Sequence, residues 1–414
     1  MSWRDDPEFN RTMDAIYASF MRRKPRLEGR HDREIRDPAL ILTIAAELDL
    51  LPPPERTVRI TGSKGKGTTS RMIARLVEQA TGQRAGLMVS PEEIEHNDRM
   101  RVNGVAPTKA EFIALFDRLR PALERAEARL AGDQYLSPFG VFLLMSLLHF
   151  RDQQVDWVIL EGGRGAAYDE VGHIPSRVAV VTSIMLEHPA SLGPTVEDVA
   201  ANKLFAGALS PRLVCPEDVS AWNDRLGVVP ADRVVVVTPA ESQPLLPDWI
   251  VQDQALAHRA ACELLGREIA PTDVTGQSAA FGQLGQGVYF DACINAASLD
   301  RGFLSQLTAS QQVVFVVSLP DDKDASGITG YISHHLHAPF HEIALTGTRG
   351  YLHYDRALAE GRVAAQIHYE DAAELTRVAT ALKQRHAAQT LYFIGTQTFI
   401  RLVKHAYQPS AAVT

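Results

Sequence analysis

The residues best suited to chemistry lie in a glycine-rich turn at residues 62–69. The turn follows a short β-rich run, Thr57–Thr61, and precedes a predicted helix, Thr68–Thr81. A strand, a glycine-rich turn and a helix open many nucleotide-binding α/β domains. Phosphate binding needs inward-pointing backbone amides, a lysine and a hydroxyl for Mg²⁺. We therefore predict that phosphate is bound by Gly62, Ser63, Lys64, Gly65, Lys66, Gly67, Thr68 and Thr69.

Two side chains of this turn have specific candidate roles. Lys66 is the candidate phosphate-binding lysine, and Thr68 is the candidate hydroxyl ligand of Mg²⁺. Their spacing departs from the GxxxxGK[ST] pattern because Gly67 separates them. An incidental basic glycine turn is the alternative, and the flanking strand and helix make it the weaker one.

The turn resembles that of the Mur ligase superfamily, and within it the folylpolyglutamate synthase/dihydrofolate synthase branch. Residues 62–68 have the sequence G-S-K-G-K-G-T, where members have G-T-N-G-K-G-S. Residues 89–104 are similar to T-S-P-H-L…E-R-I-R-V-N-G, with Glu92 in place of the histidine. Residues 160–169 are similar to E-V-G-x-G-G-R-x-D-A-T-N, with Ala167 in place of the arginine and Arg164 nearby. Residues 181–203 are similar to I-T-x-I-x-x-D-H…L-G-x-T…K.

The resemblance implies an ATP-dependent reaction. ATP would phosphorylate a substrate carboxylate, and an amine would attack the acyl phosphate, so the protein must supply positioning and positive charge. Thr68, Ser90 and Glu161 would hold one Mg²⁺, and His188 would help to hold a second. Lys203 matches a lysine that the family carbamylates, which would make it an oxygen ligand of the second metal. Lys66, His188 and Lys203 are the catalytic residues that this resemblance implies.

The C-terminal part matches the family less closely. Members have D-G-A-H-N-P where this chain keeps Asp291 and Asn295 but has Ile294 and Ala296. A preceding P-G-R is matched only by residues 281–283, which contain no arginine. The segment 322–324 resembles D-K-D, so Asp322 or Asp324 would bond a ribose hydroxyl, with an ordinary charged loop as an equal alternative. Gln252 and Gln254 are ambiguous equivalents of an adenine-side motif.

The pattern of apolar runs predicts an α/β protein. Short, continuous, β-branched runs are typical of parallel strands that are buried on both faces, and helical stretches separate them here. They recur at residues 84–89, 156–160, 178–184, 213–215 and 233–238 and, after residue 270, at 287–291, 312–318, 341–345 and 391–395. We predict an N-terminal helical region (1–50), a central P-loop parallel-sheet ATPase domain (51–270) and a C-terminal Rossmann-like α/β domain (271–414).

Some helix boundaries can be predicted from capping residues. Asp37 followed by Pro38 suits the start of a helix, and Thr195 with Asp198 forms a capping box. Residues 139–150 are the longest apolar stretch, but it is shorter than the ~18 residues expected of a membrane helix. We predict a buried helix there.

Composition limits the classes of partner. The net charge of −8 argues against a generic nucleic-acid or anionic-membrane binder. Three widely spaced cysteines form no disulfide framework, and the charged N-terminus has no apolar signal region. We expect a cytoplasmic protein whose partners are a small-molecule carboxylate and an amino acid or other amine, without nucleic acid or membrane. A protein partner is not indicated.

Three functions are compatible with these features of the sequence. The leading one is a divergent ATP- and Mg²⁺-dependent carboxylate–amine ligase that acts on a carboxylate other than a folate. The second is a nucleotide-binding pseudoenzyme or regulatory scaffold, which the change to Ile294 favours. The third is a P-loop ATPase or small-molecule kinase. A metal site in the histidine-rich segment 333–341 is disfavoured because it lacks the accompanying ligands of zinc sites.

Overall fold

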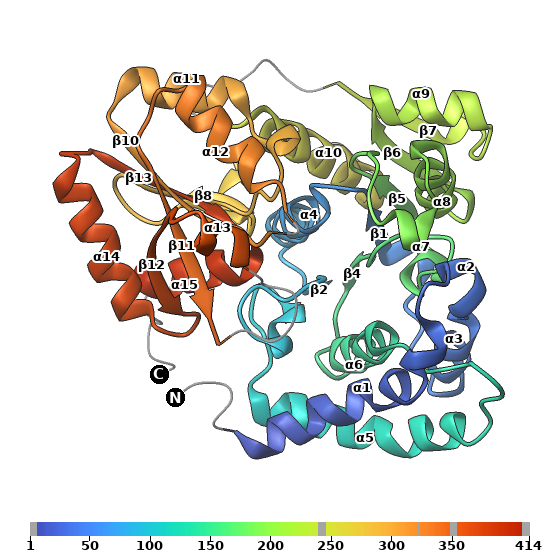
Figure 1. Ribbon diagram of the computed structural model, residues 1–414. Helices are drawn as coiled ribbons and strands as arrows, with labels where there is room; N and C mark the ends of the chain where they lie inside the picture. Colours follow the sequence, from blue (N-terminus) through green and yellow to red (C-terminus); the bar gives the residue numbers. More distant parts are fainter. Residues whose placement is uncertain (1–5, 239–245, 322, 348–353, 408–414) are drawn as a thin grey trace. The chain divides into compact units, whose positions relative to one another are not determined.

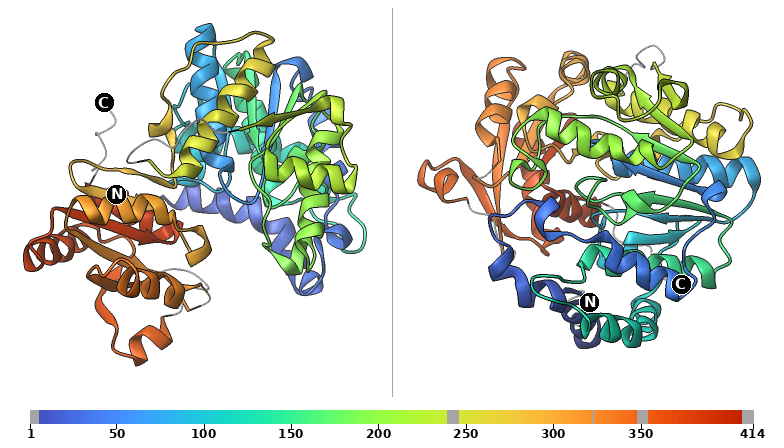
Figure 2. Two further views of the ribbon diagram at one scale, coloured as in Figure 1. Left: turned by 90° about the horizontal axis from the view of Figure 1, so that it is seen from above. Right: turned by 90° about the vertical axis from the view of Figure 1, so that its right-hand side faces the viewer.

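Two parallel-dominated sheets form the framework of the protein (Figures 1 and 2). The computed structural model describes residues 6–238, 246–321, 323–347 and 354–407. These residues divide into two units. The first extends from the N-terminus to the last strand of the first sheet and includes Ile250–Gln277, and the second contains the chain from Ser278 onward. The predicted α/β fold class, with a parallel sheet in each part, is confirmed. The predicted division into three parts stays a prediction.

The first unit contains a seven-stranded sheet in the order β3-β2-β4-β1-β5-β6-β7. All neighbours are parallel except β2 and β3. The central strands are fully buried, as expected of a sheet that helices cover. The strands are β1 (Thr57–Thr61), β2 (Ala85–Met88), β3 (Met100–Val102), β4 (Trp157–Glu161), β5 (Val178–Val181), β6 (Arg212–Pro216) and β7 (Val234–Val237).

Helices of this unit pack on the sheet and on one another. The buried helix predicted at 139–150 is α6 (Pro138–Asp152), whose residues from Gly140 to Phe150 are all buried. It shares a core with α1 (Pro7–Leu27), α3 (Pro38–Glu47) and α5 (Lys109–Glu127), which are grouped together in Figure 1. The N-terminal helices are therefore part of the core of the first unit. The other helices are α2 (Asp32–Ile35), α4 (Lys66–Thr81), α7 (Pro189–Leu192), α8 (Val196–Ala208), α9 (Glu217–Leu226) and α10 (Asp248–Leu265).

The capping predictions are confirmed. The Asp37 carboxylate accepts a hydrogen bond from the Ala39 amide at 3.1 Å, and α3 begins at the following Pro38. Thr195 and Asp198 form the predicted reciprocal capping box of α8. These bonds satisfy amides that the first turn of a helix leaves without intrahelical partners.

The second unit has a six-stranded sheet in the order β12-β11-β10-β13-β9-β8, in which only the β8–β9 pair is antiparallel. β12 was not predicted, because half of its residues are exposed and only Ile367 is buried, so it forms no continuous apolar run. The strands are β8 (Phe281–Gln283), β9 (Val288–Asp291), β10 (Val313–Ser318), β11 (Phe340–Thr346), β12 (Val363–His368) and β13 (Thr390–Gly395). The helices are α11 (Arg301–Ser310), α12 (Ala325–His334), α13 (Asp355–Ala359), α14 (Ala372–Arg385) and α15 (Gln397–Tyr407).

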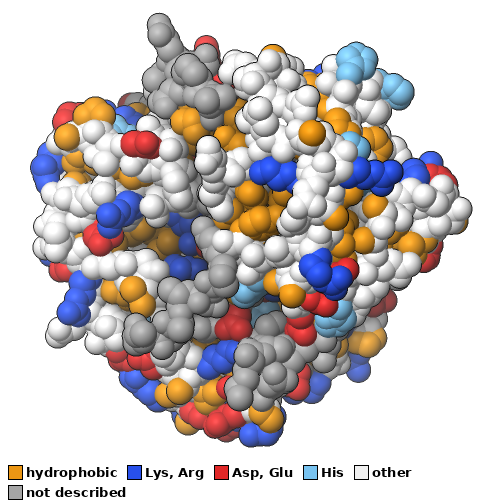
Figure 3. Space-filling view, turned by 90° about the vertical axis from the view of Figure 1, so that its left-hand side faces the viewer, with side chains coloured by type: hydrophobic (Ala, Val, Ile, Leu, Met, Phe, Trp, Pro, Cys, Tyr) orange, Lys and Arg blue, Asp and Glu red, His pale blue; other side chains and the backbone are white. Residues whose placement is uncertain are grey.

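The surface carries charges of both signs. Acidic and basic side chains are interspersed on the face that Figure 3 shows, in keeping with a modest net charge of −8. None of the described helices combines the length and the apolar character that crossing a membrane requires.

Candidate functional site

The candidate site lies where three neighbouring strands end. β4, β1 and β5 are adjacent and parallel, with Ile60 opposite Glu161 and Thr61 opposite Val181. Their carboxyl ends therefore meet at one edge of the sheet, where ligands of open α/β sheets bind. The turns that leave these ends begin at Gly62, Gly162 and Thr182. The structure thus brings together the phosphate loop and the segments that contain Glu161 and His188.

The phosphate loop is shaped by two glycines. Gly62 has φ +143°, and a Cβ there would lie 2.0 Å from Thr182 Oγ1. Gly65 has φ +81°, and a Cβ there would lie 2.3 Å from Asp253 Oδ1. Both positions therefore require glycine, because of the backbone conformation and because of the space.

The segment after β5 holds the phosphate loop in place. The Ser63 amide donates to the Ser183 carbonyl at 2.9 Å, and the Lys64 amide donates to Ser183 Oγ at 2.8 Å. The Thr182 hydroxyl also bonds the Lys64 carbonyl. The predicted strand 178–184 was wrong in its last three residues, since β5 ends at Val181 and the following groups bind the loop instead.

Lys66 lies at the start of α4. This 16-residue helix begins two residues earlier than predicted, so the first turn of the helix contains Lys66, Gly67, Thr68 and Thr69. Its amides without intrahelical partners and its dipole favour an anion at this end. Lys66 Nζ donates to the Gly62 carbonyl at 2.8 Å, which places the ammonium group within the loop. The local geometry has the parts of a phosphate-binding turn.

Glu161 is the last residue of β4 and is buried. Its Oε2 accepts a hydrogen bond from the Ser90 amide at 3.1 Å. A Cβ at Gly67 would lie 3.3 Å from the same oxygen, so the carboxylate lies against the first turn of α4. Burial raises the pKa of Glu161 to about 7, although the Lys66 charge and the Ser90 hydrogen bond act in the opposite direction. Glu161 therefore lies beside the Ser90 backbone and the first turn of α4, which contains Thr68.

Lys203 reaches the same place from α8 and has no exposed surface. Its Nζ lies 2.7 Å from Glu187 Oε1 and donates to the carbonyls of Gly62 at 2.9 Å and Arg164 at 3.2 Å. Burial, followed by the charge of Lys66, lowers the pKa of Lys203 to about 8. Lys203 thereby connects the phosphate loop to the loops after β4 and β5.

His188 is less enclosed than the other candidates. It has φ +45°, and half of its side chain is exposed. Burial of the remainder lowers its pKa below the ordinary value, with Glu187 acting in the opposite direction. The imidazole is therefore mainly neutral at pH 7, which suits a metal ligand.

Asp253 was missed by the sequence analysis. It lies on α10, is 4% exposed and packs against Gly65 of the phosphate loop. Its Oδ2 has no hydrogen-bond partner among the described residues, and burial raises its pKa well above the usual range while Thr69 acts in the opposite direction. A single aspartate in a helix gives no spacing signal, so the sequence offered no way to detect it. Glu187 was also missed, although it directly precedes His188.

Asp169 organises the loop that follows Glu161. Its two carboxylate oxygens accept hydrogen bonds from the amides of Gly163 at 2.9 Å and Val171 at 3.0 Å. Arg36 NH1 lies 3.9 Å from the same carboxylate, and Arg36 NH2 lies 2.6 Å from Glu170. The segment between α2 and α3 thus holds this loop through a buried ion-pair network.

The predicted residues of the second unit are engaged in local contacts. The Tyr392 hydroxyl lies 3.2 Å from Asp291 Oδ2, and Asn295 Oδ1 accepts from the Ser298 hydroxyl. Asp324 is the N-cap of α12, where it accepts from the Gly327 amide at 2.9 Å, and it also accepts from the Ala296 amide at 2.9 Å. Asp322 lies outside the described residues.

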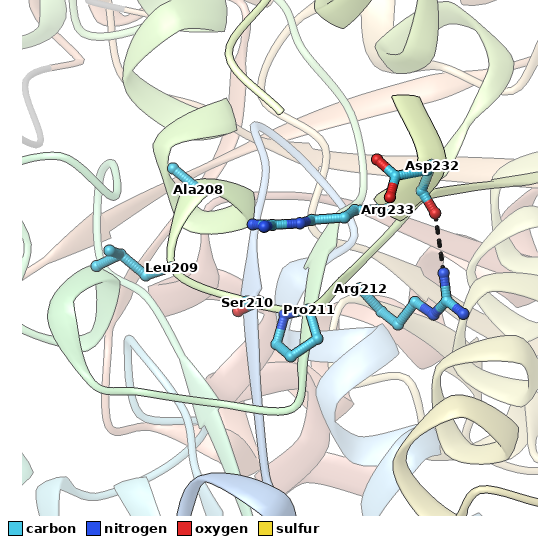
Figure 4. A pocket seen from close by; sticks show the side chains of 7 residues that line it. All are labelled: Ala208, Leu209, Ser210, Pro211, Arg212, Asp232 and Arg233. Carbon is cyan, nitrogen blue, oxygen red and sulfur yellow. Dashed lines mark hydrogen bonds between the residues drawn. The ribbon is translucent and has the colours of Figure 1, made fainter. Parts of the chain in front are cut away.

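A shallow hollow of about 610 Å³ lies apart from this site (Figure 4). It is lined by residues 208–212 with Asp232 and Arg233. Arg212 is the first residue of β6, and Arg233 immediately precedes β7. The hollow is therefore at the amino ends of the strands, whereas the phosphate loop is at the carboxyl ends.

One histidine of the segment 333–341 contacts a histidine that follows α14. His341 Nε2 lies 2.8 Å from His386 Nε2. Within the part of the chain that the structure describes, no group of three or more His, Cys, Asp or Glu side chains is arranged to hold a metal ion.

The fold and the site are those of an α/β protein with a phosphate loop at the carboxyl end of its first sheet. No family model matches the chain. The chain is 34% identical over 179 residues to dihydrofolate synthase/folylpolyglutamate synthase of Escherichia coli, a match that covers 43% of this chain and 40% of that protein. It is 30% identical over 200 residues to the enzyme of that name from Mycobacterium tuberculosis, with coverage of 46% and 40%. The chain thus spans about 40% of the length of these relatives.

Solved structures extend the likeness in fold to nearly the whole chain. Mycobacterium tuberculosis folylpolyglutamate synthase complexed with ADP and AMPPCP has a TM-score of 0.70 and 20% identity, covering 95% of this chain and 99% of that one. Escherichia coli FolC in complex with DHPP and ADP has a TM-score of 0.65 and 21% identity, covering 89% and 92%. The predicted resemblance to the folylpolyglutamate synthase/dihydrofolate synthase branch is confirmed.

Proposed function

We propose that the chain is an ATP-dependent ligase that joins a substrate carboxylate to an amine. The observation that carries this proposal is the meeting of the phosphate loop, Glu161 and Lys203 at one edge of the first sheet. A carboxylate oxygen would attack the terminal phosphorus of ATP, giving an acyl phosphate and ADP. The amine nitrogen would then attack the carbonyl carbon, the bond from that carbon to the phosphate oxygen would break, and the amine would lose a proton. The products are an amide and inorganic phosphate.

Different residues of the first unit would serve different steps of this reaction. The phosphate-loop amides and Lys66 would bind the β- and γ-phosphates and orient the terminal one. Positive charge at the transferred phosphoryl oxygens is the main contribution a protein makes to such a transfer. Lys203 and His188 would lie on the side where the carboxylate and the phosphoryl group meet.

The donor groups beside the loop fit Mg²⁺. This ion takes hard oxygen ligands, keeps several waters and uses only one or two protein carboxylates. We propose that Thr68, Ser90 and Glu161 hold one ion, and that His188 and the carbamate oxygens of a carbamylated Lys203 help to hold a second. Glu161 is buried with a raised pKa, so a cation would favour its ionised form. When bound, the ion supplies positive charge that stabilises the phosphate oxygens.

We also propose that Lys203 is carbamylated. The reaction with CO₂ needs a neutral amine, and the pKa of Lys203 is lowered to about 8. At pH 7 roughly 10% of such an amine is neutral, against roughly 0.03% at an ordinary pKa near 10.5. If the modification is required, Lys203→Ala loses activity, and bicarbonate or short carboxylates partly restore it. Full activity of that variant would refute the role.

The substrates are a small-molecule carboxylate and an amine, for which an amino acid such as glutamate is the first choice. Relatives carry the name folylpolyglutamate synthase. The changes at Glu92 and Ala167 favour a different carboxylate here. Asp291, Asn295 and Asp324, with Asp322, stay proposed contacts of the nucleotide. A cytoplasmic location stays a prediction from the sequence.

A phosphate-release assay tests the function. The protein is incubated with Mg²⁺-ATP and pools of carboxylates and amino acids, with Lys66→Ala as the inactive control. ADP and phosphate that appear only with both substrates support the ligase. ATP binding without turnover under every condition would replace it with the pseudoenzyme, for which Ile294 is the motivating change. Accumulation of a phosphorylated product would replace it with a kinase.

A further inference from the structure

Arg59 is a charged side chain inside the first sheet to which the proposed reaction assigns no part. It is the third residue of β1, the strand that leads into the phosphate loop, and it is 1% exposed. Burial lowers its pKa to about 10, and no carboxylate among the described residues forms an ion pair with it. A buried charge is costly unless it is paired and hydrogen-bonded, so neutral groups must replace the hydration of this guanidinium.

The Arg59 guanidinium uses all of its N–H groups in hydrogen bonds to neutral oxygens. The acceptors are the hydroxyls of Ser176 and Ser210 and the carbonyls of Val171, Gly172 and Ala206. The bonds from NH2 to Ala206 and Ser210 are 2.7 and 2.8 Å long. Because these N–H groups form a rigid planar fork, the bonds fix the relative positions of the acceptors.

The acceptors belong to segments that are distant in sequence. Ala206 is in the last turn of α8, and Ser210 follows this helix. Two other acceptors lie in η4 (Val171–His173), a 3₁₀ turn in the later part of the loop that connects β4 to β5. Helix α8 contacts both β1 and η4. Arg59 therefore joins β1, α8 and the loop after β4.

Lys203 joins the same three elements one helical turn earlier. It precedes Ala206 by three positions on α8. Its Nζ donates to the carbonyl of Gly62, which follows β1, and to the carbonyl of Arg164, in the earlier part of the loop after β4. The place of the Lys203 amine thus depends on how α8 lies against β1 and this loop, and Arg59 bonds both α8 and the loop from the interior of the sheet.

Stability alone does not require an arginine at this position. A well-packed apolar side chain is often at least as stabilising as a buried charged group, because it carries no desolvation penalty. Val58 and Ile60, the neighbours of Arg59 in β1, are buried apolar residues of this kind. What the guanidinium adds is a set of directional bonds that hold α8 in one place.

We propose that Arg59 is a positioning residue for Lys203. This inference rests on the proposed ligase function, in which Lys203 lies where the carboxylate and the phosphoryl group meet. Arg59 is buried and acts through α8, which it holds so that the Lys203 side chain stays at the phosphate loop. A displacement of a reacting group by about 1 Å can cost about a hundredfold in rate, so loss of these bonds should lower turnover and leave nucleotide binding unchanged.

The test is Arg59→Lys, with Arg177→Lys as the matched control. Lysine keeps the charge, but it has three N–H donors and no planar fork, so it cannot serve all of these acceptors. We expect the kcat of phosphate release to fall about tenfold or more while the KM for ATP changes by less than about twofold, because the phosphate loop keeps its own bonds to Ser183. Arg177 donates to the Glu263 carbonyl of α10 at 2.8 Å, so its variant should keep its kcat.

A crystal structure of Arg59→Lys gives the second readout. We expect Lys203 Nζ to lie beyond hydrogen-bond reach of the Gly62 carbonyl, the Arg164 carbonyl or both. If this variant does not fold, Ser176→Ala combined with Ser210→Ala removes two of the acceptors, leaves the arginine in place and is measured in the same way.

Two results would overturn the inference. One is an unchanged kcat in the folded variant, and the other is a loss of kcat while both Lys203 contacts stay intact. The ligase proposal fails separately. Absence of phosphate release by the unaltered protein with every substrate pair would refute the ligase, and a displaced Lys203 in the variant would still support the positioning role. Turnover that is insensitive to Arg59→Lys would do the reverse.

Discussion

The loops at the carboxyl end of the first sheet differ from the Asp291–Asn295 loop of the second unit in how their polar side chains are used. In the first unit, Glu161 and Lys203 are buried and have pKa values shifted toward 7–8 by burial. In the second unit, Asn295 and Asp324 accept hydrogen bonds that cap or close local turns. Buried ionisable groups with shifted pKa values are typical of functional sites. Helix-capping side chains, in contrast, typically contribute to the stability of the fold. The chemistry should therefore depend far more on the first set.

The largest expected effect is that of Lys66→Ala. Removing the ammonium group from the phosphate loop takes away charge that stabilises the transferred phosphoryl group, so turnover should fall on the order of a thousandfold. Lys383→Ala on α14 of the second unit is the control and should change turnover less than twofold. Steady-state phosphate release measures both. Equal losses of turnover in the two variants would mean that the reaction depends no more on the first unit than on the second.

The next largest effect is expected for Gly65→Ala, with Gly361→Ala as its control. Gly65→Ala introduces a Cβ at φ +81° that would lie 2.3 Å from Asp253 Oδ1. We expect ATP affinity to fall at least tenfold, because the loop must move. Gly361→Ala has a similar φ of +65° but meets no atom within 4 Å.

Calorimetric titration with AMPPCP and thermal unfolding distinguish the two variants. The Gly361 variant should lose about 1–2 kcal/mol of stability, from backbone strain alone, and keep its nucleotide affinity. Unchanged affinity in the Gly65 variant would show that the close approach of Asp253 does not shape the loop.

A smaller effect concerns the pH dependence of stability. The pKa of Lys203 is lowered to about 8 in the folded protein from an ordinary 10.5, mainly by burial. Between these pH values the unfolded chain binds more protons, so this group makes stability rise with pH, by on the order of 3 kcal/mol in total. Unfolding in urea, in CO₂-free buffer, should therefore show the unaltered protein gaining stability relative to Lys203→Met from pH 8 to 10.5. A constant difference would mean that the amine titrates normally.

The smallest expected effect is that of Asp324→Ala. Loss of the N-cap of α12 should lower the free energy of unfolding by about 1 kcal/mol. The KM for ATP should rise less than tenfold if the proposed ribose contact is secondary to the phosphate loop. A hundredfold rise in KM, at unchanged stability, would make the second unit as important to nucleotide binding as the first.

The parts of the site that have a local signature could be predicted from the sequence. Glycines, a lysine and a hydroxyl in eight consecutive residues define a phosphate loop, and β-branched runs locate the strands that position it. β5 ends three residues before its predicted end, because loop groups such as Ser183 bond the phosphate loop instead of extending the strand, and α4 begins two residues before its predicted start.

The remaining features depend on contacts that are distant in sequence. Asp253 reaches Gly65 across 188 positions, and Arg36 reaches Asp169 across 133. Such pairs have no spacing rule, so only the folded chain brings them together. The hydrogen bond from Arg59 to Ser210 is of the same kind.

Transfer of oxygen from the substrate carboxylate to phosphate tests the ligase proposal most directly. A carboxylate found active in the phosphate-release assay is labelled with ¹⁸O, and the phosphate released in the presence of ATP and the amine is analysed by mass spectrometry. Because an acyl phosphate keeps one carboxylate oxygen on the phosphoryl group when the amine displaces it, each phosphate should contain one ¹⁸O atom. Phosphate without ¹⁸O, formed at the same rate, would contradict carboxylate activation and leave simple hydrolysis of ATP by water.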